Sequence, residues 1–472
     1  MEGKPKPALR KISIFNLVMI SAAFIVSVRN LPMLAETGMK MIFFSVIAVL
    51  TFLIPTALVS AELATGWPKQ GGVYAWVREA FGDRWGFLAI WLQWIQMVFG
   101  MVTVLSFVAG SLAYVINPAL ATNKWFIIAV ILVIYWSATL FNMRGMKTSS
   151  LISTVCVNAG VFIPGALIII LGIVYLLKGS PVQFDMSLTL NNLVPKFKDI
   201  NSIALMTGIV FIFSGIEASS AHANEVENPQ RNFPKAILLT GLILVGINVI
   251  GAMSVAIVVP QNQISLASGL MEAFKHFFSQ FNMKWLLPVM AIVTGLGAVG
   301  QVSTWILGPV KGLLSTAQNG DIPPLFSKLN KNKIPTTLLI LQASLVSIIG
   351  ILFFVAVPNI NTAFIMVLNV TMILYLIMYI LMFISAIKLR YSEPEVERAY
   401  KVPGGNPGMW LVAIVGILTS LLTIFVGFFP PAQLHIKNPT TYRLFISLST
   451  IIMLTIPFII YALRKPSWQK ND

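Results

Sequence analysis

The sequence predicts an all-α membrane protein with twelve transmembrane helices. Three observations support this fold class: the composition, the length of the uncharged stretches and the placement of the basic residues. Of the 472 residues, 57% are hydrophobic and only 10% are charged, whereas soluble domains carry roughly 25% charged residues. A helix needs about 20 apolar residues to cross a bilayer. Several stretches without Asp, Glu, Lys or Arg exceed this length: 41–61, 85–123, 148–177, 236–271, 285–310, 334–387 and 402–436.

Each predicted helix follows from such a stretch or from a shorter apolar run. Two of the long stretches are divided, at Pro358-Asn359 and at Pro430-Pro431, because proline disfavours a continuing helix. Shorter apolar runs near residues 12–34 and 200–222 add the first and the sixth helix. In chain order the predicted helices are 12–35, 40–65, 87–115, 125–142, 149–177, 201–222, 235–259, 284–317, 336–357, 361–389, 408–429 and 443–463.

The net charge of +16 is distributed as is typical of a membrane protein. With twelve spans, 22 of the 32 Lys and Arg residues fall on the face that carries both chain ends, 9 fall on the other face, and Arg29 lies within the first span. Basic residues of short loops collect on the cytoplasmic side. We therefore predict a multi-pass membrane protein with cytoplasmic termini, and the lipid bilayer rather than nucleic acid as a partner.

None of the motifs that resemble catalytic or cofactor sites indicates such a site in this sequence. GLGAVG, residues 295–300, matches G-x-G-x-x-G, but it lies within a predicted span and follows no strand, so close helix packing explains it better. The three histidines, His222, His276 and His435, are scattered, and no H-E-x-x-H or cysteine pair is present. We expect a protein that is not an enzyme and that has no metal site and no cofactor.

Glu217 is the main candidate for a functional residue. It lies in GIVFIFSGIEASSAHA, residues 208–223, where His222 is the only other ionisable group. A carboxylate in an apolar, membrane-length segment costs several kcal/mol unless it is paired, protonated or in contact with water. We interpret Glu217 as part of a functional site. The alternative is a structural ion pair or a hydrogen bond to a neighbouring helix.

Two predicted helices contain residues that interrupt an apolar run. The first is AAFIVSVRNLP, residues 22–32, with Ser27, Arg29 and Asn30, and the second is FSGIEASS, residues 213–220. Broken helices in transporters expose backbone N–H and C=O groups that bind small polar solutes at the midplane. The two segments lie five helices apart, which is the spacing expected of an inverted repeat of five plus five helices.

Arg29 has two open interpretations. In an unbroken helix that begins at Ile12, Arg29 lies roughly 26 Å along a hydrocarbon core about 30 Å thick, so a helix kinked at Pro32 lets its side chain reach the outer headgroups. If the helix is unwound, the guanidinium lies beside a water-filled cavity, where it binds an anion bidentately. The second interpretation predicts that Arg29 selects substrates with an acidic side chain or a second carboxylate.

Four loop motifs resemble signatures of the amino acid-polyamine-organocation (APC) transporters. They occur in the expected order and together span nearly the whole chain: GWPKQGGVYAWVREAFG (66–82), NEVENPQRNFPKAI (224–237), GPVKGLLSTAQNGDIPPLFSKLNKNKIPTTL (308–338) and YKVPGG (400–405). The combination of VYAWVREAFGDRWGF, IEASSAHANEVENP and WILGPVKG is most similar to the glutamate/γ-aminobutyrate antiporter branch.

The resemblance implies a single integral membrane domain, residues 1–472, with a LeuT-type inverted repeat. The first repeat covers about 12–177, the second about 201–389, and two peripheral helices cover about 408–463. Such a protein exchanges amino acids by alternating between outward-facing and inward-facing states.

The resemblance also implies roles for particular residues. Glu217 matches the family's sixth-helix glutamate and is expected to couple or sense protons. Phe211–Ile216 match the stretch whose carbonyls hold the substrate's amino group, and Trp305 matches an aromatic residue that covers the substrate; we expect Trp305 and Phe211 to act as gates. The full set of predicted substrate-binding residues is Ser27, Arg29, Asn30, Phe211, Phe213, Ser214, Gly215, Ile216 and Trp305.

Three departures from the family pattern limit what is implied. Ile25-Val26-Ser27 replaces the common G-S-G break of the first helix, so the resemblance does not imply unwinding there. The chain ends nine residues after Leu463, so we expect neither the C-terminal plug of acid-resistance members nor their steep acid activation. The fifth-helix region SSLISTVCVNAG has no lysine, which argues against a lysine that substitutes for sodium.

The function predicted from these observations is secondary active amino-acid transport. Antiport with glutamate- and γ-aminobutyrate-like substrates is the leading hypothesis. A proton-coupled amino-acid importer is the alternative within transport, and a non-transporting membrane amino-acid sensor is the alternative from another class.

Overall fold

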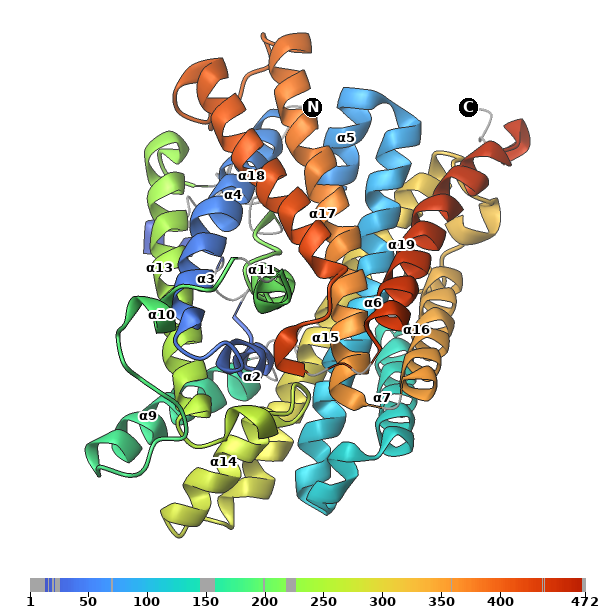
Figure 1. The fold of residues 1–472 in the computed structure, drawn as a ribbon. Helices are drawn as coiled ribbons and strands as arrows, with labels where there is room; N and C mark the ends of the chain where they lie inside the picture. Colours follow the sequence, from blue (N-terminus) through green and yellow to red (C-terminus); the bar gives the residue numbers. More distant parts are fainter. Residues whose placement is uncertain are drawn as a thin grey trace, which may run out of the picture.

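The computed structural model shows a bundle of helices (Figure 1). It describes residues 13–15, 17–18, 21, 26–68, 71–144, 158–197, 200–217, 226–357, 359–434, 436 and 438–468. Throughout this described part of the chain the regular elements are helical. Ten of its helices are long and apolar enough to cross a membrane.

The ten span-length helices coincide with ten of the predicted ranges. Helix α13 begins at Pro229 instead of residue 235, because proline is well accommodated in a first helical turn. The predicted start at residue 149 lies outside the described residues, and the remaining ends differ from the prediction by a few residues. The helices are Lys40–Gly66 (α3 Lys40–Ala48, η2 Val49–Leu53 and α4 Ile54–Gly66), α6 Asp83–Ile116, α7 Lys124–Met143, η4 Asn158–Phe162 with α9 Ile163–Leu177, α13 Pro229–Ala256, α15 Leu286–Gln318, α16 Thr336–Ala356, α17 Ile360–Ser392, α18 Gly405–Gly427 and α19 Pro439–Ala462.

The other two predicted ranges, 12–35 and 201–222, are interrupted. In the first, Val26 and Ser27 lie outside any helix, Ser27 is extended, and η1 Val28–Asn30 and α2 Leu31–Ala35 follow. Ser27 has φ −151° and ψ 122°, a conformation open to any residue, so the break needs no glycine at Ile25-Val26-Ser27. In the second, η5 Ile200–Ile203 and α11 Met206–Ile212 end before Glu217, and residues 218–222 lie outside the described residues.

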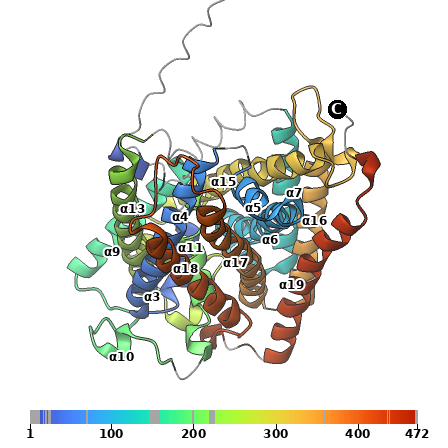
Figure 2. The ribbon, with the colours of Figure 1, turned by 90° about the horizontal axis from the view of Figure 1, so that it is seen from above.

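Helices α6 and α17 form the centre of the bundle. They have the most buried spans, 83% and 78% of the apolar window, and they pack against each other, with α15 against α6 and α18 against α17. Figure 2 shows α13 and α9 on one side of this centre and α16 and α19 on the other. The short helix α11 lies between α3, α17 and α18, so the second interruption lies beside α17.

The glycines of residues 295–300 allow two helices to approach closely. A Cβ atom added to Gly297 in α15 would lie 2.5 Å from the Cα atom of Gly160 in η4. Only glycine is compatible with this separation, because real Cβ atoms do not come so close to backbone. The interpretation of GLGAVG as a packing motif is therefore confirmed.

A buried ion cluster joins α4, α17 and the segment between α17 and α18. Arg390 of α17 donates from Nε and Nη2 to the two oxygens of Glu62 in α4, at 2.7 and 2.6 Å. The backbone N–H of Val402 donates to the same carboxylate at 2.6 Å. Arg398 adds a charge contact of 3.6 Å to Glu62 and lies 5.0 Å from the ring centroid of Trp67. The YKVPGG motif is thereby fixed against α4 and α17.

We expect Asp321, which follows α15, to make stability depend on pH. Its carboxylate is buried, and Arg464 lies 3.3 Å away. Burial raises the pKa of Asp321 to about 6, and Arg464 only partly offsets this. Because the folded state holds this proton more tightly than the unfolded state, stability should fall as pH rises from about 4 through 6.

Thermal unfolding of the purified protein tests the pH dependence of stability expected from Asp321. The wild type should melt roughly 1 °C lower at pH 7 than at pH 5 through this group, and Asp321→Asn should lose that difference. Asp185→Asn, which changes an exposed loop carboxylate, is the control and should keep it. An equal pH difference in all three proteins would contradict the assignment.

Candidate functional site

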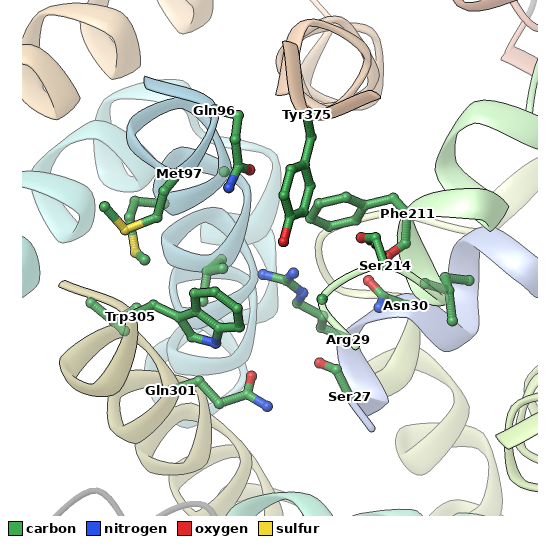
Figure 3. Close-up of a pocket in the computed structure, with 16 residues that line it drawn as sticks. Ser27, Arg29, Asn30, Gln96, Met97, Phe211, Ser214, Gln301, Trp305 and Tyr375 are labelled. Atoms are coloured by element: carbon green, nitrogen blue, oxygen red, sulfur yellow. Dashed lines mark hydrogen bonds between the residues drawn. The ribbon is translucent and has the colours of Figure 1, made fainter. Parts of the chain in front are cut away.

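A cavity of about 100 Å³ lies between the two interrupted segments and helices α6, α15 and α17 (Figure 3). Residues from five parts of the chain thus surround one space near the centre of the bundle. Its walls are Ser27, Arg29 and Asn30 from the first interruption; Phe211, Ile212, Ser214 and Gly215 from the second; Gln96, Met97, Gly100, Met101 and Val104 from α6; Gln301, Val302 and Trp305 from α15; and Tyr375 from α17.

The cavity brings together seven of the nine residues predicted to bind substrate. Phe213 and Ile216 are fully buried and lie outside the lining, because the backbone turns after Ile212 and directs these two side chains into the surrounding core. Glu217 is also buried and does not line the cavity itself.

The guanidinium of Arg29 points into the middle of the cavity (Figure 3). Its Cζ atom lies 5.7 Å from the ring centroid of Phe211, and its Nη1 atom is buried without a hydrogen-bond partner. Arg29 takes part in none of the ion pairs found between described residues. The interpretation in which Arg29 extends to the outer headgroups is therefore wrong, and the physical reason is the break at Val26 and Ser27.

The break at Val26 and Ser27 leaves backbone carbonyls without a helical partner. The side chain of Gln301, from α15, donates a hydrogen bond to the carbonyl of Val26 at 3.4 Å. A freed backbone group inside a membrane protein requires such a partner. Gln301 thus supports the interrupted segment and also lines the cavity.

Glu217 is held by two tyrosines of α17. Tyr375 and Tyr379 each donate a hydrogen bond from the phenol hydroxyl to one carboxylate oxygen, the second at 2.5 Å. The N–H of Gly215 donates to the Tyr379 hydroxyl at 2.9 Å. The structure therefore contains the hydrogen bond to a neighbouring helix that was one interpretation of Glu217. Because Tyr375 also lines the cavity, one side chain separates the carboxylate from bound solute.

Gly215 is required by its backbone conformation. Its φ is +97°, and a Cβ atom added there would meet only the Trp305 ring, at an ordinary 3.8 Å. We therefore expect Gly215→Ala to cost roughly 1 to 2 kcal/mol through the backbone alone, which shifts the N–H that donates to Tyr379. Melting temperature and exchange rate should both fall. Gly246→Ala, at a helical position with free space around it, is the control; an equal fall in both variants would contradict this explanation.

The chemistry of the walls suits recognition of an anion. The polar groups on the walls are one guanidinium, the amides of Gln96, Gln301 and Asn30, and hydroxyl groups. No carboxylate is among the described lining residues, and no group of His, Cys, Asp and Glu suitable for a metal is found in the described part of the chain. A buried guanidinium with a free N–H favours an anionic ligand.

Sequence reasoning missed the walls that α6 and α17 contribute. Gln96 and Gln301 are side-chain amides in long apolar spans, and this could have identified them. Tyr375 and Tyr379 are four residues apart, hence on one helix face, which was a signal for a paired role. Met97, Gly100 and Met101 carry no comparable signal in the sequence.

Comparison with known proteins places the chain in a family. The family model described as amino acid permease matches residues 12–456. An uncharacterized transporter of Legionella pneumophila is 40% identical over 95% of this chain and 96% of its own length. A glutamate/gamma-aminobutyrate antiporter of Lactococcus lactis is 32% identical, over 96% of this chain and 91% of its own length. A probable agmatine/putrescine antiporter of the same species is 26% identical, over 94% and 93%. The chain therefore belongs to the amino acid permease family, a family of multi-pass membrane transporters in the APC superfamily.

Proposed function

We propose that the protein is a secondary amino-acid antiporter of the bacterial plasma membrane, exchanging glutamate- and γ-aminobutyrate-like substrates. The observation that carries this is Arg29: its guanidinium points into the cavity with Nη1 free, and no described lining residue supplies a carboxylate. An uncompensated buried cation is costly, and an anionic substrate removes that cost. The name of the Lactococcus relative at 32% identity agrees with such substrates.

The proposed substrate pose follows from the two interruptions. One carboxylate meets the guanidinium of Arg29, and the other approaches the N–H groups near Ser27 and Gly215. The amino group meets backbone carbonyls of residues 211–214, at the C-terminal end of α11, where the helix dipole favours a cation. Trp305 and Phe211 lie on the walls and act as gates.

The proposed architecture extends the ten span-length helices to twelve membrane segments. The interrupted segments supply the first and the sixth, and because they lie five helices apart and line one cavity, they support the repeats 12–177 and 201–389 with peripheral helices at 408–463. Both termini are cytoplasmic in this arrangement, as the basic residues indicate. Alternating access would then move one repeat against the other around the cavity.

A proton-coupled importer is the second candidate. The contact of Glu217 with Tyr375 on the cavity wall favours it, because a carboxylate next to a substrate site can carry a proton. A sensor that binds without transport is the candidate from another class.

Counterflow in proteoliposomes separates the three. We expect radiolabelled glutamate to enter vesicles loaded with unlabelled glutamate or γ-aminobutyrate, and not to enter empty vesicles with or without a proton gradient. Uptake into empty vesicles that requires an acidic exterior would favour the importer. Binding without uptake in any condition would favour the sensor.

A further inference from the structure

A second and larger cavity lies behind the interrupted first segment. Its volume is about 300 Å³, and it is enclosed by that segment, by η4 and α9, and by α13. These elements lie side by side, with α9 against α13 and α13 against α2, at the left of Figures 1 and 2. Most of the walls are apolar: Val28, Leu31, Val161, Phe162, Ala166 and Ile247.

The cavity opens toward the side of the bundle that faces lipid. Phe162 is 38% exposed and Ala166 is exposed, whereas Val161, Val28 and Leu31 at the inner end are buried. Beside this opening, α9 exposes Ile170 and α13 exposes Ile250 in the middle of their spans. Exposed apolar residues at this depth contact acyl chains. The opening is therefore continuous with the surface that the bilayer covers.

The walls offer few partners to water. Ser27 and Asn248 carry the polar side chains of the lining, and the amide of Asn248 already donates to the carbonyl of Leu244 at 2.9 Å. Apolar cavities stay dry, and an empty one forfeits the dispersion contacts of its walls. An apolar occupant restores these contacts, and acyl chains are the apolar groups present at this opening.

We propose that this cavity binds one acyl chain of a membrane phospholipid. Ser27 lines this cavity and the cavity with Arg29. The acyl chain therefore packs behind the non-helical backbone at Val26 and Ser27, whose other side faces the solute. The site is distinct from the transport site and does not depend on which solute is transported.

Photolabelling tests the proposal in proteoliposomes of phosphatidylethanolamine and phosphatidylglycerol. The probe is a phosphatidylethanolamine with a diazirine at the end of one acyl chain, and labelled residues are mapped by mass spectrometry after irradiation. We expect label on Val161, a buried wall residue, well above that on Ile168, a buried residue of α9 outside the cavity. Label on Ile170, which faces bulk lipid, measures the labelling that occurs outside the cavity.

Two variants make the test specific. Ala166→Phe places a bulky ring at the opening, and label on Val161 should fall to the level of Ile168 while label on Ile170 is unchanged. Ile170→Phe, on the same helix outside the cavity, should leave the label on Val161 intact. If Ala166→Phe does not fold, Ile247→Phe narrows the cavity from the opposite wall and should give the same loss. Wild-type label on Val161 at the level of Ile168, or label that survives both Phe substitutions in the cavity, would overturn the proposal.

Discussion

Arg29→Ala should weaken competition by glutamate by roughly tenfold to a hundredfold, because one charge-assisted pair contributes about 1.5 to 3 kcal/mol. The guanidinium points into the cavity and its Nη1 atom has no protein partner, so the interaction lost is one with substrate. Neutral amino acids place no second carboxylate there and should compete nearly as well as before. The measurement is inhibition of radiolabelled counterflow by unlabelled glutamate and by neutral amino acids.

Arg29→Lys is the matched variant. It keeps the charge but loses the planar, bidentate donor pair, so glutamate affinity should fall between wild type and Arg29→Ala. Equal weakening for all substrates in Arg29→Ala would make Arg29 a structural residue, through its contact with Phe211. Unchanged affinities for all substrates in Arg29→Ala would show that Arg29 does not bind substrate.

Glu217→Gln should reduce exchange by at least about tenfold while the protein still folds. The carboxylate accepts hydrogen bonds from the hydroxyls of Tyr375 and Tyr379. An amide of the same shape turns an N–H toward one of the two hydroxyls, so one charge-assisted bond of about 1.5 to 3 kcal/mol is lost. Because Tyr375 lies on the cavity wall, the change reaches bound solute. Exchange rates across a pH series, with size-exclusion chromatography to check folding, measure this.

The two tyrosines provide the internal comparison. Tyr375→Phe removes the hydroxyl that lies between cavity and carboxylate, and Tyr379→Phe removes the hydroxyl that also accepts the N–H of Gly215. We expect Tyr375→Phe to lower substrate affinity as well as rate, and Tyr379→Phe to lower thermal stability more. An exchange rate and pH profile for Glu217→Gln that match wild type would show that the carboxylate is not needed for transport.

Some properties of this protein depend only on local sequence. The length of an uncharged stretch decides whether a helix can cross a bilayer, so the existence of ten spans could be predicted. Polar or small residues within an apolar run suggested both interruptions, Ser27 and Arg29 in the first and Gly215 in the second. The loop motifs likewise identified the family, and a carboxylate within an apolar segment identified Glu217, because desolvation penalises such a group in any fold.

The directions in which the side chains point could be determined only from the tertiary structure. A helix rotates by about 100° per residue, and only packing against neighbours decides which face meets the cavity. The sequence therefore did not distinguish Arg29 in a cavity from Arg29 at the headgroups, and it grouped Phe213 and Ile216 with residues that line the site. Gln96, Gln301 and Tyr375 come from three helices far apart in the chain, and the cavity behind Ser27 exists only where α9 and α13 meet the first segment. Each of these results depends on how distant helices pack, which no single stretch of sequence determines.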